Sequence, residues 1–432
     1  MLLTIEKLVY GGDGLARLPA DEHGRGKAVF IPFVLEGEVV ETSLLEQKPG
    51  FTRARADAIT KSSPHRTEAV CPYFRACGGC HYQHANYAHQ LEIKASILKE
   101  NLRRIAKVEL DAELIVHPSP PWNYRNRTRL KVQTQPEFAL GYYKFNSHSL
   151  LPVEQCPISS PLINRAITAL WQAGRSSPLP LEVQEIELFA NADDDQLLLE
   201  VYCATATGPD VAMQAAQELK TAVPEATGVV MFRQARNPSQ EAEKLAAHGA
   251  GELTYTTAHS SYRVSAGAFF QVNRHLIGQL LQIVTDGQSG DTALDLYAGV
   301  GLFSSALPRS FAQVVAVESS PTSYADLLYN SPSNVKTVHA TTDQFLKNRA
   351  GNHRPNLVVV DPPRSGLGEM VVRRLAELGA RQVTYVSCDP ATLSRDLAGL
   401  LHAGYRIRQA HVLDLFPQTF HLESVFQLVS TQ

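Results

Sequence analysis

The chain has few of the features that place a protein in a membrane or outside the cell. Its 432 residues include only six cysteines, and these are too unevenly spread for a disulfide framework. No apolar run approaches the roughly 18 residues that a membrane-spanning helix needs. Glu6 and Lys7 interrupt the apolar start of the chain, which argues against a signal peptide. We therefore expect a soluble, cytoplasmic protein without a membrane partner.

The sequence also lacks an excess of basic residues. Lys and Arg number 40 against 43 Asp and Glu, which gives a formal net charge of -3. No overall positive field therefore marks a nucleic-acid-binding protein, and any such site has to be a local patch. The length exceeds one ordinary domain, and a hydrophobic content of 44% suffices for two to four packed cores.

The distribution of apolar runs predicts three regions. Residues 1–58 contain short β-like runs and turns such as "GGDG", which is typical of a small barrel. Residues 59–265 mix strands and helices, and the helical segment at about 88–108 is expected to pack on the region that follows. In residues 266–432, four apolar runs alternate with helical segments: "TALDLYAGVG", "QVVAVES", "PNLVVVDPP" and "QVTYVSCDP". This rhythm predicts a Rossmann-like α/β domain, with function at the carboxyl ends of its parallel strands.

The first of these runs ends in a glycine-containing turn that is typical of a cofactor site. Gly299 and Gly301 allow close approach of a ligand to the backbone, and Glu318 at the end of the next strand can accept ribose hydroxyls. The third glycine of the dinucleotide fingerprint is missing, which favours S-adenosylmethionine over NAD. Asp343, in "ATTDQF", follows the third expected strand of this region, which lies before the run "PNLVVVDPP". It is either an adenine contact or a helix N-cap.

Asp361 ends the third apolar run and is followed by two prolines, which stop the strand and stiffen the turn. Enzymes that methylate exocyclic amines often carry an aromatic residue in such a turn to stack the base. The residue here is Arg364, which counts against amine methylation.

Cys388 ends the fourth run, and Asp389 and Pro390 have the pattern of an N-cap and a first helical residue. The helix N-terminus favours a thiolate and the Asp389 carboxylate opposes it, so the direction of the pKa shift stays open. Considered alone, the thiol is better explained as a buried structural residue. Its position beside the cofactor strands favours a catalytic nucleophile instead.

A cysteine cluster and a basic stretch precede the α/β region. Cys71, Cys77 and Cys80 lie within ten residues, which in a cytosolic protein points to a metal or a cofactor. Cysteine thiolates suit either zinc or an iron–sulfur cluster, and the spacing alone slightly favours zinc, because structural zinc is commoner. In "WNYRNRTRLKV", four cations occur at a period of two, Arg125, Arg127, Arg129 and Lys131. On a strand they share one face, and we expect RNA contact there, the alternative being a solvated strand face.

Seven ordered segments resemble the RNA uracil-C5 methyltransferases that carry an N-terminal TRAM barrel and an iron–sulfur cluster. They are "CPYFRACGGC", "YRNR", "FFQVN", "DLYAGVG", "DPPRSGL", "YVSCDPATLSRDL" and "DLFPQTFHLESV", and they extend over essentially the whole chain. The resemblance implies an OB-like TRAM barrel, a central α+β RNA-binding domain with a metal cluster, and a methyltransferase domain. It also implies a monomer that uses S-adenosylmethionine.

The resemblance assigns a role to each candidate residue. Cys388 becomes the nucleophile that attacks C6 of uracil, and Glu423 the general base that removes the C5 proton. The cofactor site comprises Gln271, Tyr297, Gly299, Glu318, Asp343 and Asp361. The [4Fe–4S] ligands are Cys71, Cys77, Cys80 and Cys156, whereas Cys203 is expected in the core. Some family members carry Asn where this chain has Leu302, which puts one polar cofactor contact in doubt.

The arrangement of barrel and cluster favours 23S ribosomal RNA as the substrate, with tRNA as the second candidate. Two other classes stay open. A non-catalytic RNA-binding or ribosome assembly factor would not need Cys388, Glu423 and Asp361, and a methyltransferase acting on amines or proteins would leave Cys388 unexplained.

Overall fold

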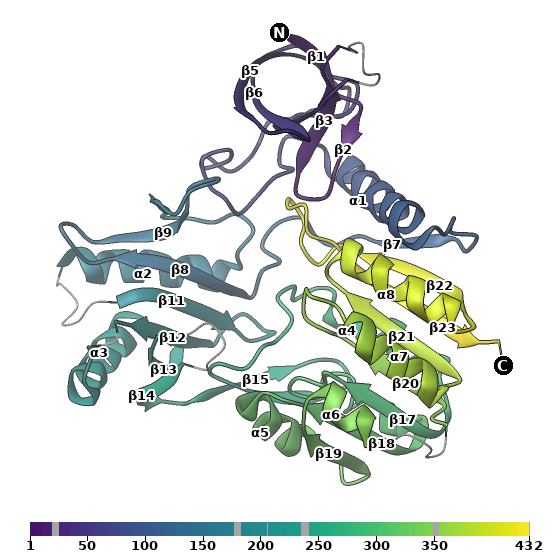
Figure 1. Ribbon diagram of the computed structural model, residues 1–432. Helices are drawn as coiled ribbons and strands as arrows, with labels where there is room; N and C mark the ends of the chain where they lie inside the picture. Colours follow the sequence, from purple (N-terminus) through teal and green to yellow (C-terminus); the bar gives the residue numbers. More distant parts are fainter. Residues whose placement is uncertain (20–25, 177–182, 205, 235–241, 349–353, 432) are drawn as a thin grey trace.

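The structure, a computed structural model, describes residues 1–19, 26–176, 183–204, 206–234, 242–348 and 354–431 (Figure 1). Its strands form a six-stranded, a seven-stranded and an eight-stranded sheet and one separate hairpin. Among these residues, no helix is both long and apolar enough to cross a membrane.

The N-terminal sheet closes on itself because one segment contributes to both of its ends. β1 pairs with β5 and β2 pairs with β3, yet β1 and β2 follow each other directly in the sequence. The sheet order β1-β5-β6-β4-β3-β2 therefore forms the ring seen in Figure 1. Its interior is apolar and includes Ile5, Val29 and Ile31. The strands are β1 Leu2–Thr4, β2 Lys7–Leu8, β3 Asp13–Arg17, β4 Ala28–Pro32, β5 Val39–Gln47 and β6 Phe51–Lys61.

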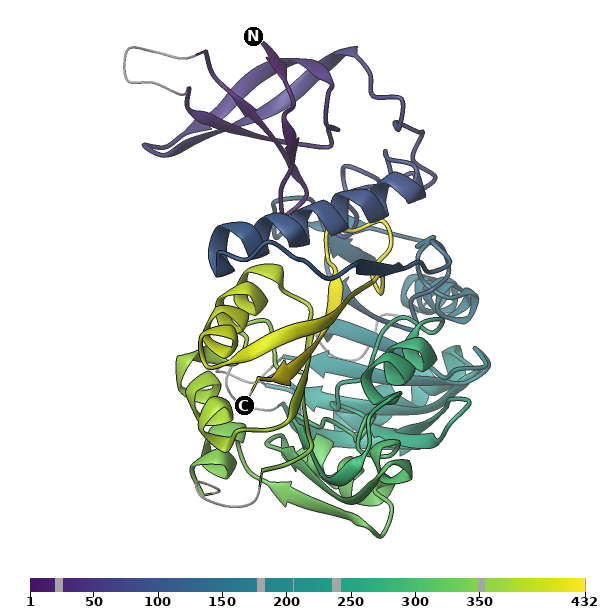
Figure 2. The same ribbon diagram turned by 90° about the vertical axis from the view of Figure 1, so that its right-hand side faces the viewer.

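A helix connects this barrel to the C-terminal region. α1 (Tyr87–Asn101) continues into a π-helical turn at Leu102–Ala106 and crosses between the two (Figure 2). Leu98 packs into the core of the C-terminal sheet, whereas Ile93 and Ile97 share an apolar cluster with Leu8 of the barrel. The helix thus contacts both regions, and its N-cap is Asn86, whose side chain accepts from the backbone N–H of His89.

The central seven-stranded sheet has the order β10-β9-β8-β11-β12-β13-β14. Ile186 and Leu188 of β11 pack with residues of α2 and α3 in one apolar core. The alternate residues, including Glu187, point to the opposite face, because side chains alternate along a strand. The elements are β8 Arg127–Gln133, β9 Ala139–Tyr143, β10 Leu150–Pro152, α2 Pro161–Ser176, β11 Val183–Ala190, β12 Leu197–Cys203, α3 Pro209–Ala222, β13 Ala226–Arg233 and β14 Glu243–Gly249.

The C-terminal sheet has the order β19-β18-β17-β20-β21-β23-β22-β7, and β17 to β21 are parallel, as the apolar runs predict. The strand order reverses between β17 and β20, and open α/β sheets bind ligands at such a reversal. The elements are β17 Gly290–Leu296, β18 Phe311–Glu318, α5 Pro321–Asn330, β19 Val335–His339, α6 Thr342–Lys347, β20 Leu357–Val360, α7 Gly368–Leu378, β21 Gln382–Ser387, α8 Pro390–His402, β22 Tyr405–Leu413 and β23 Glu423–Ser430.

Two segments differ from the predicted division at residue 265. β7 (Leu114–His117) pairs in parallel with β22, so it extends the C-terminal sheet. The hairpin of β15 (Glu252–Thr256) and β16 (Ser261–Ser265) pairs with neither large sheet, and its Arg263 forms an ion pair of 2.7 Å with Asp326 of α5. The pairing of β7 with β22 and the ion pair of Arg263 with Asp326 are both non-local, so neighbouring sequence does not show them.

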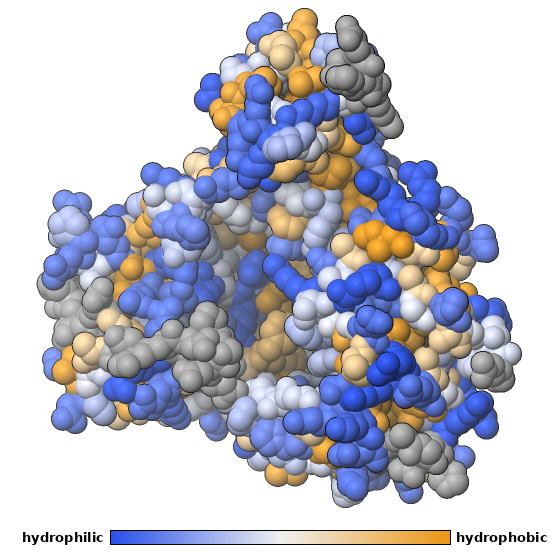
Figure 3. All heavy atoms as spheres, in the orientation of Figure 1, coloured by the Kyte–Doolittle hydropathy of each residue, from blue (hydrophilic) through white to orange (hydrophobic). Residues whose placement is uncertain are grey.

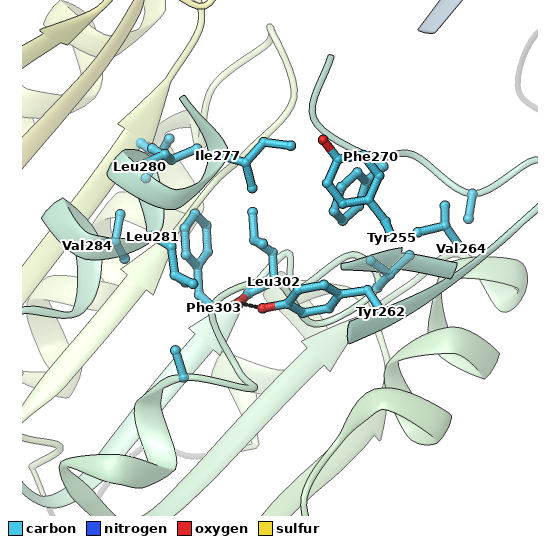
Figure 4. Close-up of a cluster of buried hydrophobic side chains, with 14 of the residues drawn as sticks. Tyr255, Tyr262, Val264, Phe270, Ile277, Leu280, Leu281, Val284, Leu302 and Phe303 are labelled. Carbon is cyan, nitrogen blue, oxygen red and sulfur yellow. Dashed lines mark hydrogen bonds between the residues drawn. The ribbon is translucent and has the colours of Figure 1, made fainter. Parts of the chain in front are cut away.

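This hairpin supports the predicted cofactor loop through an apolar cluster (Figure 4). The Tyr262 hydroxyl donates to the Leu302 carbonyl at 3.3 Å, and Phe303 packs in the same cluster against α4 (Ile277–Thr285). Leu302 is therefore a core residue, which accounts for an apolar side chain at this position.

Candidate active site

The predicted site residues lie along one edge of the C-terminal sheet. Glu318 is the last residue of β18, and Tyr297, Asp361 and Cys388 directly follow β17, β20 and β21. Since these four strands are parallel neighbours, their carboxyl ends meet at the same edge. β23 is antiparallel to β21 and begins with Glu423, so this residue also lies at that edge.

The pairing of β21 with β23 places Glu423 opposite Cys388. Val386 pairs with Val425 and Ser387 pairs with Ser424, the last pair of this register. Cys388 and Glu423 are the next residues of the two strands, and the charge of Glu423 acts on the Cys388 thiol. Directly opposed residues on antiparallel strands point to the same face of the sheet, with Cβ atoms about 5 Å apart. The candidate nucleophile and the candidate base are therefore neighbours, although their sequence positions suggest no such relation.

Asp389 and Pro390 begin α8 as the sequence predicts. The Asp389 carboxylate accepts from the backbone N–H of Ala391 at 3.0 Å and of Thr392 at 2.8 Å. Burial, followed by the negative charges of Glu423 and Asp361, raises the pKa of the Cys388 thiol to about 12, while Arg364 acts in the opposite direction. These surroundings favour the thiol form of Cys388 over the thiolate.

The two carboxyl groups beside Cys388 also favour their protonated forms. Burial, followed by the charge of Asp361, holds the pKa of Glu423 well above its usual range. Burial, followed by the charge of Asp295, raises the pKa of Asp361 to about 7. Arg364 lowers the pKa of Glu423 and that of Cys388. This edge of the sheet therefore concentrates acidic groups and favours a cationic ligand, whose charge would restore their ionised forms.

The loop after β17 has the open backbone of a ligand-binding turn. Tyr297, Gly299 and Gly301 have φ values of 64°, 56° and 96°. Positive φ is unfavourable for a residue with a side chain, such as Tyr297, and is easily adopted by glycine. The backbone N–H of Gly299 donates to Glu318 Oε2 at 2.8 Å, and a Cβ added at Gly299 would meet no atom within 4 Å. The glycine therefore leaves free space beside the acidic residue, as a bound nucleoside requires.

Two further cofactor candidates have different surroundings. Asp343 forms an ion pair with Arg374 of α7, and the N-cap of α6 is Thr341, which forms a capping box with Gln344. The N-cap interpretation of Asp343 is therefore wrong. Gln271 is buried in the segment between β16 and α4.

The loop between β22 and β23 is fixed by residues that the sequence did not mark as functional. Two residues of α1 contact this loop: Lys94 binds the Asp414 carboxylate, and the Gln90 side chain donates to the Gln418 side chain. The hydroxyl of Tyr124 donates to the Pro417 carbonyl at 3.0 Å. Further contacts come from Asn273, which donates to the carbonyls of Asp414 and Leu415, and from the backbone N–H groups of His81 and Tyr82, which donate to the Gln418 carbonyl. Residues that are far apart in the sequence, at positions 81–82, 90–94, 124 and 273, thus meet at the loop that leads to Glu423.

Four of the six cysteines line one cavity of about 220 Å³: Cys71, Cys77, Cys80 and Cys156. None is in a disulfide, and the backbone N–H of Gly79 donates to the Cys77 sulfur at 3.4 Å. Within the part of the chain that the structure describes, no three His, Cys, Asp or Glu side chains form a group that could hold a single metal ion. The thiols thus share a space but do not converge on one point. Cys203 is buried in the core.

Arg127, Arg129 and Lys131 of the predicted basic stretch lie on β8, whereas Arg125 precedes this strand. Acidic residues of the neighbouring strands β11 and β12 pair with the three cations on β8. Arg127 is buried and binds Glu187 and Glu200, and it also donates to the Ala268 carbonyl. Arg129 binds Glu187 and Glu185, and Lys131 binds Glu185. Arg127, Arg129 and Lys131 thus have acidic partners within the protein, and the expected RNA contact of this stretch stays a prediction. For Arg125, whose Nε donates to the Arg127 carbonyl, the structure places the side chain at the wall of the cysteine cavity.

The parallel α/β sheet, with its glycine-containing turn after β17 and Glu318 at the end of β18, has a methyltransferase-like fold, and Cys388 follows β21 at the same edge. A family model of the tRNA (Uracil-5-)-methyltransferases matches residues 86–430. The chain therefore belongs to this family, and it is an S-adenosylmethionine-dependent RNA methyltransferase. The prediction of an enzyme of this class is confirmed.

Full-length relatives support the assignment. The chain is 34% identical over 430 residues to an RNA methyltransferase of Aquifex aeolicus, a match covering 98% of this chain and 97% of the relative. It is 32% identical over 435 residues to the 23S rRNA (uracil(1939)-C(5))-methyltransferase RlmD of Klebsiella pneumoniae, covering 98% and 94%. The tRNA (uracil-54, C5)-methyltransferase structure of Pyrococcus abyssi shares the fold, with a TM-score of 0.75, 22% identity, and coverage of 99% and 100%.

Proposed function

We propose that this protein methylates C5 of a uridine in 23S ribosomal RNA through a covalent bond between Cys388 and C6 of the base. The observation that carries this proposal is the register of β21 and β23, which sets Glu423 opposite Cys388 at the edge that also bears the glycine loop. A methyltransferase that acts on an amine has no use for this pair.

The chemistry requires both residues. C5 of uracil is too weak a nucleophile to accept a methyl group directly, and addition of the Cys388 thiolate to C6 turns C5 into an enolate-like carbon. After the methyl group has joined C5, Glu423 removes the C5 proton, and the bond between sulfur and C6 breaks to release the product and the thiolate. S-adenosylmethionine, when bound, supplies the methyl group.

The charge of the pocket supports this cofactor. Glu318, Asp361 and the buried Asp295 surround the loop, and both the sulfonium and the ammonium of S-adenosylmethionine are cations. Tyr297 and Gly299 border the free space in the loop, and Gln271 and Asp343 complete the proposed set. A cation held there would lower the pKa values of Asp361, Glu423 and Cys388, which burial raises.

Two surfaces support binding to RNA. Figure 3 shows a hollow between the lobe of the central sheet and that of the C-terminal sheet, below the barrel. A second concavity, between the barrel and the segment that follows it, is lined by Arg53, Arg55 and Arg75 together with Phe30, Phe33 and Phe145. Asp13 and Asp57, which pair with Arg53 and Arg55, also line it. Cations suit phosphates and aromatic rings suit unstacked bases, which agrees with a TRAM domain. The RlmD relatives of Klebsiella pneumoniae and Pseudomonas fluorescens align over 98% of this chain, and they favour 23S RNA over tRNA.

We also propose that Cys71, Cys77, Cys80 and Cys156 ligate a [4Fe–4S] cluster. A cluster is larger than a single ion, so its ligands surround a space, and the cavity of about 220 Å³ bordered by the four thiols is of this kind. The N–H group of Gly79 that points at the Cys77 sulfur suits a thiolate ligand. Anaerobically purified protein should contain four irons and four sulfides per chain. Stoichiometric zinc would overturn the assignment.

Mapping of 5-methyluridine in ribosomal and transfer RNA tests the substrate. RNA from cells that lack the gene should lose the modification at a position of 23S RNA, and wild-type protein, but not Cys388→Ala, should restore it. Loss from tRNA alone would replace 23S RNA by tRNA. Unchanged modification of both RNAs would favour the non-catalytic assembly factor.

A further inference from the structure

The N-terminal barrel reaches the candidate nucleophile with one tyrosine. Tyr10 lies in the turn between β2 and β3, and its hydroxyl donates to the Cys388 carbonyl at 3.2 Å. The Tyr10 ring meets Phe420 edge-on, with ring centroids 5.3 Å apart and planes at 88°. Tyr10 therefore links the strand end that carries Cys388 with the loop that leads to Glu423.

Several contacts hold this turn in place. Lys7 of β2 forms an ion pair with Glu100 of α1, and Leu8 packs with Leu422 in one apolar cluster. A Cβ added at Gly12 would lie 3.0 Å from His81 Cβ, so the turn is also close against the cysteine segment. The position of Tyr10 thus depends on the docking of the whole barrel.

We propose that Tyr10 is a positioning residue for the methylation reaction, through which the docked barrel fixes the backbone of Cys388 relative to the Phe420–Glu423 segment. The inference rests on the proposed function. Its physical basis is that a tethered nucleophile spends more of its time in the geometry that attacks C6, and that one lost hydrogen bond loosens it. The Tyr10 hydroxyl is directed at the protein, so it affects the reaction step and leaves RNA affinity unchanged.

Tyr10→Phe removes the hydroxyl and keeps the ring that packs on Phe420. Tyr405→Phe is the matched control, because its hydroxyl donates to the Ala380 carbonyl at 2.9 Å at the opposite end of the sheet. The full-length protein with bound cofactors is mixed in excess with a 23S RNA fragment that contains 5-fluorouridine. The rate constant, the amplitude of covalent adduct formation and the Kd for the RNA are measured.

Tyr10→Phe should lower the rate constant about three- to tenfold, with the Kd and the amplitude unchanged. Tyr405→Phe should match the wild type. A merely structural role would lower the amplitude, since fewer molecules would be competent, and leave the rate constant intact. That result, or equal rate constants for Tyr10→Phe and the wild type, would overturn the inference.

A second measurement separates this inference from the proposed function, because it needs no RNA. Iodoacetamide labelling of Cys388, followed by mass spectrometry of its peptide, reports how freely the thiol is presented. Tyr10→Phe should label at least threefold faster than the wild type and Tyr405→Phe at the wild-type rate. Equal labelling of all three proteins would overturn the inference, whereas absence of any RNA adduct in the wild type would overturn the proposed function.

Discussion

Lys94 and Asp414 form an ion pair of 2.5 Å with both side chains fully buried, although 320 positions separate them in the sequence. Lys94 also donates to the Phe416 carbonyl at 2.9 Å. The pair joins α1, which contacts the barrel, to the start of the loop that positions Glu423. A buried ion pair is seldom a source of net stability, so a role in fixing this loop is the better reason for its presence.

Removal of one partner of this pair should be costly. Lys94→Met leaves the Asp414 carboxylate buried without its cation, and the free energy of unfolding should fall by about 3–5 kcal/mol. The double variant Lys94→Met/Asp414→Leu should recover part of this loss in urea unfolding. Arg373→Met, at the exposed pair with Glu377, is the control, with an expected change below about 0.5 kcal/mol. A double variant less stable than Lys94→Met would contradict this account.

Asp295 should make the stability of the unliganded protein depend on pH. Its pKa is raised from 3.8 to about 7, chiefly by burial, so the folded state favours the protonated form. The stability that this proton contributes is complete below pH 3.8 and is lost as the pH rises through about 7. Asp295→Asn should unfold with a flatter dependence of free energy on pH between these values. A dependence equal to that of the wild type would exclude Asp295 as its source.

Gly299→Ala tests the free space in the cofactor loop. The φ of 56° should cost about 1 kcal/mol of stability for alanine, and the added methyl group should also enter the space meant for the cofactor. Gly287→Ala carries a similar backbone cost, with φ 68° and no atom near the added Cβ, but lies before β17 at the other edge. Calorimetry should show weaker S-adenosylmethionine binding for Gly299→Ala alone. Equal affinities in both variants would place the cofactor elsewhere.

Arg127 should be a structural residue rather than an RNA contact. Arg127→Met leaves Glu187 and Glu200 without this cation, and the free energy of unfolding should fall by about 3–5 kcal/mol. Arg165→Met, at the exposed pair with Glu225, should change stability by less than about 1 kcal/mol. If Arg127→Met instead weakened RNA binding at unchanged stability, the original interpretation of the basic strand would be restored.

Local signals in the sequence predicted the elements that local interactions determine. The N-cap at Asp389 and the first helical residue Pro390 follow from neighbouring residues, and β21 ends at Ser387, one residue before the predicted end at Cys388. The parallel C-terminal sheet was equally visible, since each buried strand is a continuous apolar run.

Pairing between distant segments was not visible in the sequence. The acids that neutralise Arg129 and Lys131 come from β11, where Glu187 pairs with Arg129 and Glu185 with Lys131, and cross-strand register cannot be inferred from a period of two. The contact of Tyr10 with Cys388 spans 378 positions and depends on how the barrel docks. Such contacts depend on tertiary packing, and a sequence motif contains only one of the two residues that meet.

The central claim, that Cys388 bonds to C6 of a uridine, is tested most directly by trapping. A 5-fluorouridine substrate cannot lose a C5 proton, so wild-type protein with S-adenosylmethionine should form a stable adduct with a 23S RNA fragment, and mass spectrometry should place the link on the Cys388 peptide. Cys388→Ala should bind the same RNA and form no adduct. An adduct that persists in Cys388→Ala, or one located on another residue, would contradict the account.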